Sequence, residues 1–74
     1  MRELLLKAFK AYCVGHLERH KANIENLITA NVGLADHPDI IETIGKEMEQ
    51  VAKYDEQLQM IDKHFIRQRV IGRK

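Results

Sequence analysis

Apolar residues recur every three or four positions along two stretches of this chain, and a short segment rich in turn-forming residues separates the stretches. The first stripe, between about residue 3 and residue 30, runs through Leu6, Phe9, Cys13, Leu17, His20, Ile24 and Leu27. The second, between about residue 38 and residue 69, runs through Ile41, Ile44, Met48, Val51, Leu58 and Phe65. This spacing places each stripe on one face of an α-helix, so the sequence predicts two amphipathic helices.

The segment between the stripes, residues 31–37, contains the signals that end one helix and begin another. Asn31 and Gly33 adopt the left-handed conformation that closes a helix more readily than most residues. Pro38 is favoured in the first turn of a helix, because the N–H that it lacks would have no intrahelical acceptor there. A connection this short between long helices implies that they lie side by side and antiparallel.

The expected fold is all-α: a single domain over residues 1–74, formed by an antiparallel, coiled-coil-like two-helix hairpin with a basic tail at residues 70–74. Folding the two arms back about the bend brings together residues whose numbers sum to roughly 68. This register places His20 opposite Met48. It is the geometric basis for the candidate sites below.

The apolar positions of both stretches are broader than the single line that one hairpin seam buries. Burying one of the flanking side chains contributes about 1.5–3 kcal/mol, which is large beside the net stability of a small domain. The hairpin is therefore expected to associate, either with itself into a helical bundle or with a larger protein. The flanking residues expected to contact the partner are Leu5, Tyr12, Ile28, Ile40, Ile61 and Ile66.

Charge changes this picture only at the ends of the hairpin. The formal net charge is +1, but acids prevail between residues 36 and 62 and only bases follow. Acids at the amino end of the second helix and bases at its carboxyl end are the arrangement that the helix dipole favours.

An alternative function is a dimeric hairpin that binds nucleic acid through its basic open end. The residues for that function are Lys7, Lys10, Lys63, Arg67, Arg69, Arg73 and Lys74.

Three potential metal ligands, Cys13, His16 and His20, are spaced to share one face of the first helix. Asp55 would approach them from the second helix, so these four residues are a candidate metal site. Asp55 could equally pair with His16 without a metal. The preferred interpretation is that His20, Asp55 and Asp62 are polar positions inside the seam, where such residues set register and oligomeric state.

No catalytic residue and no cofactor are expected from the sequence. Cys13 with His16 is a conceivable nucleophile and base, but no loop, pocket or oxyanion donor accompanies the pair.

A single cysteine excludes an intrachain disulfide and favours a reducing compartment. Lys7 and Lys10 interrupt the apolar residues near the start of the chain. Neither a signal peptide nor a membrane span, which needs ~20 apolar residues, is therefore expected.

Three motifs, taken together, resemble those of short helical proteins of tailed bacteriophages. The motifs are His20-Lys21-Ala22-Asn23, then Val32-Gly33-Leu34-Ala35-Asp36-His37-Pro38-Asp39, and then Tyr54-Asp55-Glu56. The phage proteins carry H-K-x-N, V-G-x-x-[DE]-H-P-D and Y-[DE]-[DE] in the same order, so the likeness covers about residues 20–65. It implies a viral origin, as a small virion component or a modulator of a host protein, located in the virion or the host cytoplasm. It brings no catalytic or ligand residues with it.

Overall fold

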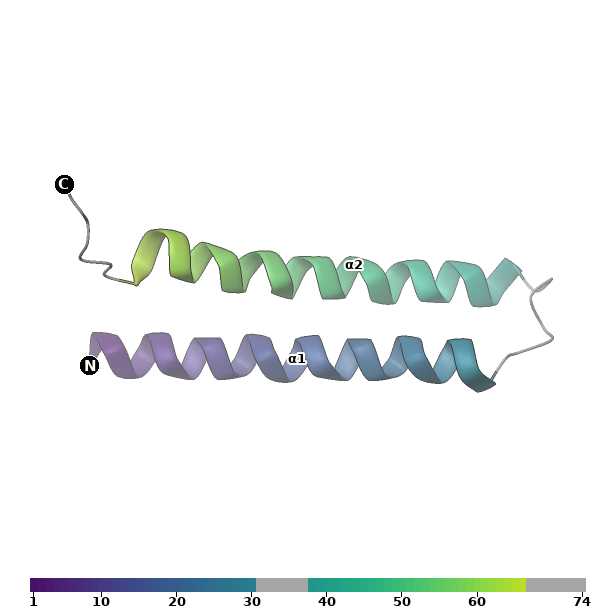
Figure 1. Ribbon diagram of the computed structural model, residues 1–74, viewed down its shortest axis with the longest axis horizontal. Helices are drawn as coiled ribbons and strands as arrows, with labels where there is room; N and C mark the ends of the chain where they lie inside the picture. The colour runs from purple at the N-terminus through teal and green to yellow at the C-terminus, as the bar shows by residue number, and fades with distance from the viewer. Residues whose placement is uncertain (31–37, 67–74) are drawn as a thin grey trace.

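The computed structural model describes residues 1–30 and 38–66, and these form two antiparallel helices lying side by side (Figure 1). The first helix, α1, spans Arg2–Ala30, and the second, α2, spans Pro38–Met60. A single π-helical turn, η1 (Ile61–Phe65), continues α2 toward the open end of the hairpin. The expected all-α hairpin is confirmed.

The bounds of α1 and the start of α2 agree with the sequence prediction. The predicted bend (31–37) and the predicted basic tail (70–74) lie outside the described residues. Within the part of the chain that is described, neither helix combines the length and the apolar content needed to cross a bilayer.

The carboxyl end of the second helix differs from the prediction of helix up to about residue 69. Helical backbone ends at Phe65, because Ile66 is extended with φ −86° and ψ 128°. The N–H of Ile66 donates to the carbonyl oxygen of Ile61 at 2.9 Å, which closes a π-type turn. Arg2 Nη2 donates to the carbonyl oxygen of Phe65 at 2.5 Å. A cationic side chain from the start of α1 therefore satisfies a carbonyl at the end of the second arm, where the helix is electronegative.

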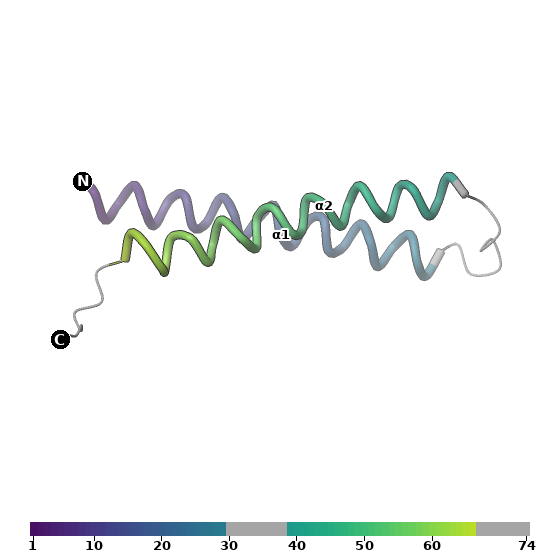
Figure 2. Tube along the Cα trace, turned by 90° about the horizontal axis from the view of Figure 1, so that it is seen from above, coloured from purple at the N-terminus to yellow at the C-terminus, as the bar shows by residue number. Residues whose placement is uncertain are grey.

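Side chains at least half-buried recur in a seven-residue repeat along both helices, and they form the seam between them. In α1 these positions are Leu6, Lys10, Cys13, Leu17, His20, Ile24 and Leu27. In α2 and η1 they are Ile40, Ile44, Glu47, Val51, Tyr54, Leu58 and Ile61. Spacings that alternate between three and four keep a seam facing its partner along left-handed coiled helices, and Figure 2 shows the two helices crossing at a shallow angle.

The face of the second helix that enters the seam differs from the prediction by one residue. Ile41 and Met48, predicted to be inside, are 60% and 51% exposed, and Phe65 is also exposed. The predicted register is nearly correct, since His20 contacts Glu47, the residue before Met48. Because the two lines share Ile44, Val51 and Leu58, the helix is rotated by about half of the 100° step between successive residues, which moves the line through Ile41 and Met48 out of the seam.

The same rotation corrects the interpretation of Asp55 and Asp62 as seam residues. Both carboxylates are exposed. Asp55 accepts a hydrogen bond from Gln59 Nε2 at 3.1 Å, and Asp62 pairs with Lys10 Nζ at 3.9 Å. Only His20 of the three predicted polar seam residues lies in the seam.

Gly15 lies in the middle of α1 with no heavy atom within 4 Å of the position that a Cβ would occupy. Because glycine is about 1 kcal/mol less favourable than alanine inside a helix, we expect Gly15→Ala to raise the free energy of unfolding by about that amount. Urea unfolding followed by circular dichroism measures it. A loss of stability at high protein concentration would instead place another chain against this position.

Candidate interaction surfaces

A partly buried polar cluster around His20 lies between the two helices. His20 is buried, and its Nδ1 lies 2.5 Å from Glu47 Oε1. Asn23 Nδ2 donates to the same carboxylate oxygen at 3.3 Å. Arg19 Nη2 lies 3.5 Å from Nε2 of His20. A neutral imidazole that donates through Nδ1–H and accepts at Nε2 satisfies both neighbours, so the contacts favour that tautomer.

The hydrogen bond from His20, followed by that from Asn23, lowers the pKa of the Glu47 carboxyl below its ordinary value. A carboxyl whose pKa is lower in the folded state stabilises that state above its unfolded pKa, and the contribution is lost as the pH falls through the folded pKa. We therefore expect the stability advantage of the wild type over Glu47→Gln to be full at neutral pH and to shrink below about pH 4.5. Paired urea titrations across that range measure the difference. An advantage that does not change with pH would contradict the assignment.

Aromatic and imidazole rings stack beside this cluster around Tyr54, which is 6% exposed. The ring of Tyr54 lies nearly parallel to those of His16, at 4.9 Å, and His20, at 6.1 Å. Tyr12 meets Tyr54 edge-on at 6.0 Å between centroids, and Lys53 Nζ lies 5.0 Å from the centroid of the Tyr54 ring. Stacked rings of this kind contribute about 0.5–1.5 kcal/mol per pair beyond burial. Tyr54 therefore joins the two helices more extensively than any residue chosen from the sequence.

The hydroxyl of Tyr54 also acts on its neighbour. A hydrogen bond to Tyr54, followed by the unfavourable charge interaction between the two phenols, raises the pKa of Tyr12 above its ordinary value. The sequence prediction placed Tyr54 on a flank. The sequence does carry a signal for Tyr54. The seven-residue repeat that includes Ile40 and Tyr54 contains one acid, Glu47, whereas the predicted repeat through Ile41 and Met48 continues through two, Asp55 and Asp62.

The proposed metal site is not formed by the described residues. The thiol of Cys13 is fully buried and donates to Gln57 Oε1 at 3.6 Å, while Asp55 points to Gln59. Across residues 1–30 and 38–66, no group of three or more His, Cys, Asp or Glu side chains is placed to hold one ion. Cys13, His16, His20 and Asp55 therefore do not converge. His20 is oriented by Glu47 instead.

Burial raises the pKa of the Cys13 thiol, because a thiolate is poorly solvated there. The Cys13 thiol donates to Gln57 and not to His16, and within the described part of the chain Nδ1 of His16 has no hydrogen-bond partner. A buried thiol with a raised pKa is a weak nucleophile. The geometry gives this pair no catalytic arrangement.

The six residues predicted to contact a partner divide into three groups. Leu5, Tyr12 and Ile28 are more than half exposed, as expected. Ile40 and Ile66 are half-buried. The prediction was wrong for Ile61, which belongs to the buried core because the second helix is rotated.

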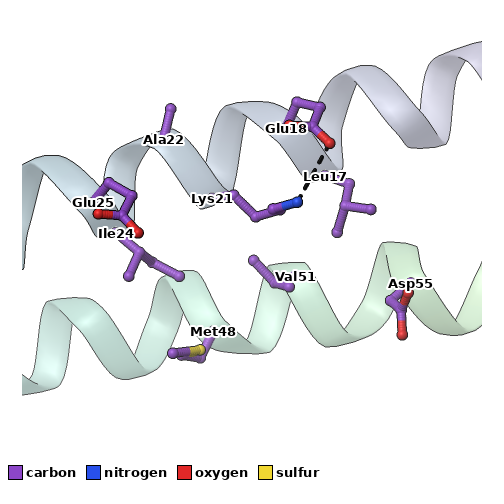
Figure 3. A pocket seen from close by; sticks show the side chains of 9 residues that line it. All are labelled: Leu17, Glu18, Lys21, Ala22, Ile24, Glu25, Met48, Val51 and Asp55. Carbon is purple, nitrogen blue, oxygen red and sulfur yellow. Dashed lines mark hydrogen bonds and ion pairs between the residues drawn. The ribbon is translucent and has the colours of Figure 1, made fainter.

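Exposed hydrophobic side chains lie on both broad sides of the hairpin. One side, here called the groove side, carries a groove of about 590 Å³ between α1 and α2. Figure 3 shows Leu17, Ile24 and Val51 around this space, with Lys21 paired to Glu18 of the same helix at 3.5 Å. The residues lining it are Leu17, Glu18, Lys21, Ala22, Ile24, Glu25, Met48, Val51 and Asp55. The opposite side, here called the aromatic side, presents Tyr12 and His16 beside Gly15 and Arg19.

The basic residues of the alternative function are described only in part. Lys7 is exposed at the open end, and Lys10 is half-buried and paired with Asp62. Lys63 is exposed on η1. Arg67, Arg69, Arg73 and Lys74 lie outside the described residues. Nucleic-acid binding stays a sequence prediction.

Comparison of the chain with protein-family models, with curated proteins and with solved structures gave no match.

Proposed function

We propose that this protein is a non-enzymatic interaction module, a helical hairpin that binds protein surfaces, a second copy of itself among them, through its exposed apolar sides. The observation that carries the proposal is the balance of burial. The buried hydrophobic residues of the described chain are Cys13, Ile24, Tyr54 and Ile61. The exposed large ones are Met1, Leu4, Leu5, Phe9, Tyr12, Val14, Ile28, Ile41, Met48, Met60 and Phe65.

The energetics of burial support association. Each large apolar side chain that a partner covers contributes about 1.5–3 kcal/mol, whereas a whole small domain is stable by only 5–15 kcal/mol, roughly. Covering four or five of the exposed side chains therefore supplies a free energy comparable to that of folding. Contiguous apolar patches on both sides of a two-helix layer are typical of interaction surfaces.

A role in phage assembly fits this surface, as a virion component between larger proteins or as a modulator of a host protein. That part of the proposal rests on the resemblance of the bend motif and of the two flanking motifs. Such roles require a protein that presents apolar surface without catalytic machinery. The buried Cys13 thiol, with its raised pKa, supports the non-enzymatic assignment.

Size-exclusion chromatography with light scattering, over a wide range of protein concentration, tests the proposal. We expect dimers or larger species, and a thermal midpoint that rises with concentration, since association stabilises the folded chain by mass action. A chain that stays monomeric at the highest concentration and unfolds at a midpoint independent of concentration would overturn self-association.

A further inference from the structure

The groove side carries a repeating line of residues on each helix. Residues seven apart lie two turns apart on nearly the same flank, so the groove residues Lys21 and Met48 define one line each. The line on α1 is Lys7, Val14, Lys21 and Ile28. The line that begins on α2 is Ile41, Met48, Asp55 and Asp62. All eight side chains are exposed, and together they flank the seam along its whole length.

The charges on these two lines are opposite in sign, and each line is apolar at its bend end and charged at its open end. The ionisable residues of the α1 line are lysines, and those of the α2 line are aspartates. Toward the bend both lines end in isoleucine, Ile28 on one helix and Ile41 on the other. Toward the open end they finish in Lys7 and Asp62, and Asp62 already lies beside Lys10 of its own chain.

Two symmetric arrangements bring a second copy onto this side. If the two-fold axis runs perpendicular to the helices, α1 lies on α1 of the second copy, reversed end for end, and the isoleucines face the charged open end. If the axis runs parallel to the helices, α1 lies on α2 of the second copy at the same level. Ile28 then meets Ile41, and Lys7 meets Asp62. Of the two arrangements, only the second matches apolar with apolar at the bend end and base with acid at the open end, while between the ends Lys21 comes level with Met48 and Val14 with Asp55.

Resting on the proposed function, we infer that a second copy of this chain covers the groove side, with the two-fold axis parallel to the helices, to form an antiparallel four-helix bundle. The groove around Leu17, Ile24 and Val51 becomes the centre of the bundle. Every helix then has antiparallel neighbours, as in other up-and-down bundles. The aromatic side, with Tyr12, stays uncovered and available to a different protein.

The dimensions of the groove side are sufficient for a stable dimer. The length of α1, 29 residues, gives about 43 Å at 1.5 Å per residue, and two adjacent helices are about 20 Å wide. The resulting face of roughly 850 Å² matches the ~800 Å² per partner of a standard interface. Met48 and Ile41, both more than half exposed in the single hairpin, lie within that area.

Directed disulfide formation between two different variants tests the inference. One variant carries Ile28→Cys, the other carries Ile41→Cys with a tag that changes its mass, and the two are mixed unfolded and refolded together. We expect oxidation to join Ile28→Cys to Ile41→Cys well above random pairing, because only these two positions fall within disulfide distance across the interface. Both replaced side chains are exposed, so circular dichroism should show unchanged helicity.

Matched controls separate the outcomes. Asn26→Cys mixed with Lys46→Cys places thiols at exposed positions that helical spacing assigns to the aromatic side, and we expect little product from this pair. Wild type should give none, because Cys13 is fully buried. Dimers that link the control pair instead, or that pair Ile28→Cys and Ile41→Cys at random, would overturn the inference and leave self-association standing. A chain that light scattering finds monomeric at every concentration overturns both.

Discussion

Ile24→Asp is expected to unfold the hairpin. Ile24 is 7% exposed in the seam beside the His20 cluster, so the substitution removes about 1.5–3 kcal/mol of apolar burial. It also places a carboxylate at a buried position in the seam, and the desolvation of a buried charge costs several kcal/mol, roughly. A total loss of about 4 kcal/mol or more approaches the whole stability of a small domain. Circular dichroism at neutral pH should show the helical signal largely lost.

The adjacent residue provides the matched control. Glu25 is exposed at the rim of the groove and outside the seam, so Glu25→Ala should change stability by no more than about 0.5 kcal/mol. The comparison tests which face of α1 is buried. Helix propensity does not explain the expected difference, because the helix propensities of aspartate and isoleucine differ by only about a few tenths of a kcal/mol. Equal loss of helicity in the two variants would show that the face has been assigned incorrectly.

Tyr54→Ala is expected to be the most damaging substitution in the second helix. The ring of Tyr54 contacts those of Tyr12, His16 and His20 and lies under the ammonium group of Lys53. Truncating a buried aromatic residue to alanine costs about 3–5 kcal/mol, because the cavity left behind refills only in part. Urea unfolding monitored by circular dichroism measures the loss. We expect a folded population only at low urea, or none.

Tyr54→Phe separates the ring from its hydroxyl. The ring stacking is retained, so most of the stability should remain. The chain has two tyrosines, and this variant leaves Tyr12 as the sole phenol to titrate. Because the hydrogen bond to Tyr54 is the main cause of its raised pKa, the pKa of Tyr12 should fall toward 10 in an ultraviolet absorbance titration. If Phe and Ala variants are equally unstable, the hydroxyl rather than the ring is what joins the helices.

The extent and direction of both arms follow from local sequence. Apolar spacing and high helix propensity predict α1 up to Ala30, and Pro38 predicts the first residue of α2. The end of the second arm is less well determined by local signals, because residues beyond Phe65 still favour helix. The π-type turn at Ile61 and the bond from Arg2 to Phe65 end it, and the second of these exists only because the hairpin brings the start of α1 beside the end of the second arm.

The site was predicted less well than the fold, and His20 illustrates why. The sequence indicates that this residue sits inside an apolar stripe, and it is buried. Its partner was expected to be level with Met48, and the structure supplies Glu47, one residue away. A carboxylate at hydrogen-bonding distance from a buried imidazole is a three-dimensional fact, and helical spacing within either arm does not reveal it.

What the sequence determined by itself is therefore a pair of amphipathic helices and the point at which each meets the bend, since these depend on interactions within a few residues. The tertiary structure alone decided how the second helix is rotated. Its lines of apolar residues through Ile40 and through Ile41 share Ile44, Val51 and Leu58, so periodicity leaves two orientations that differ by about half of the 100° step between successive residues. Packing against α1 selects the line that buries Tyr54 and Ile61 and joins Glu47 to His20, and it turns Met48 outward onto the groove side.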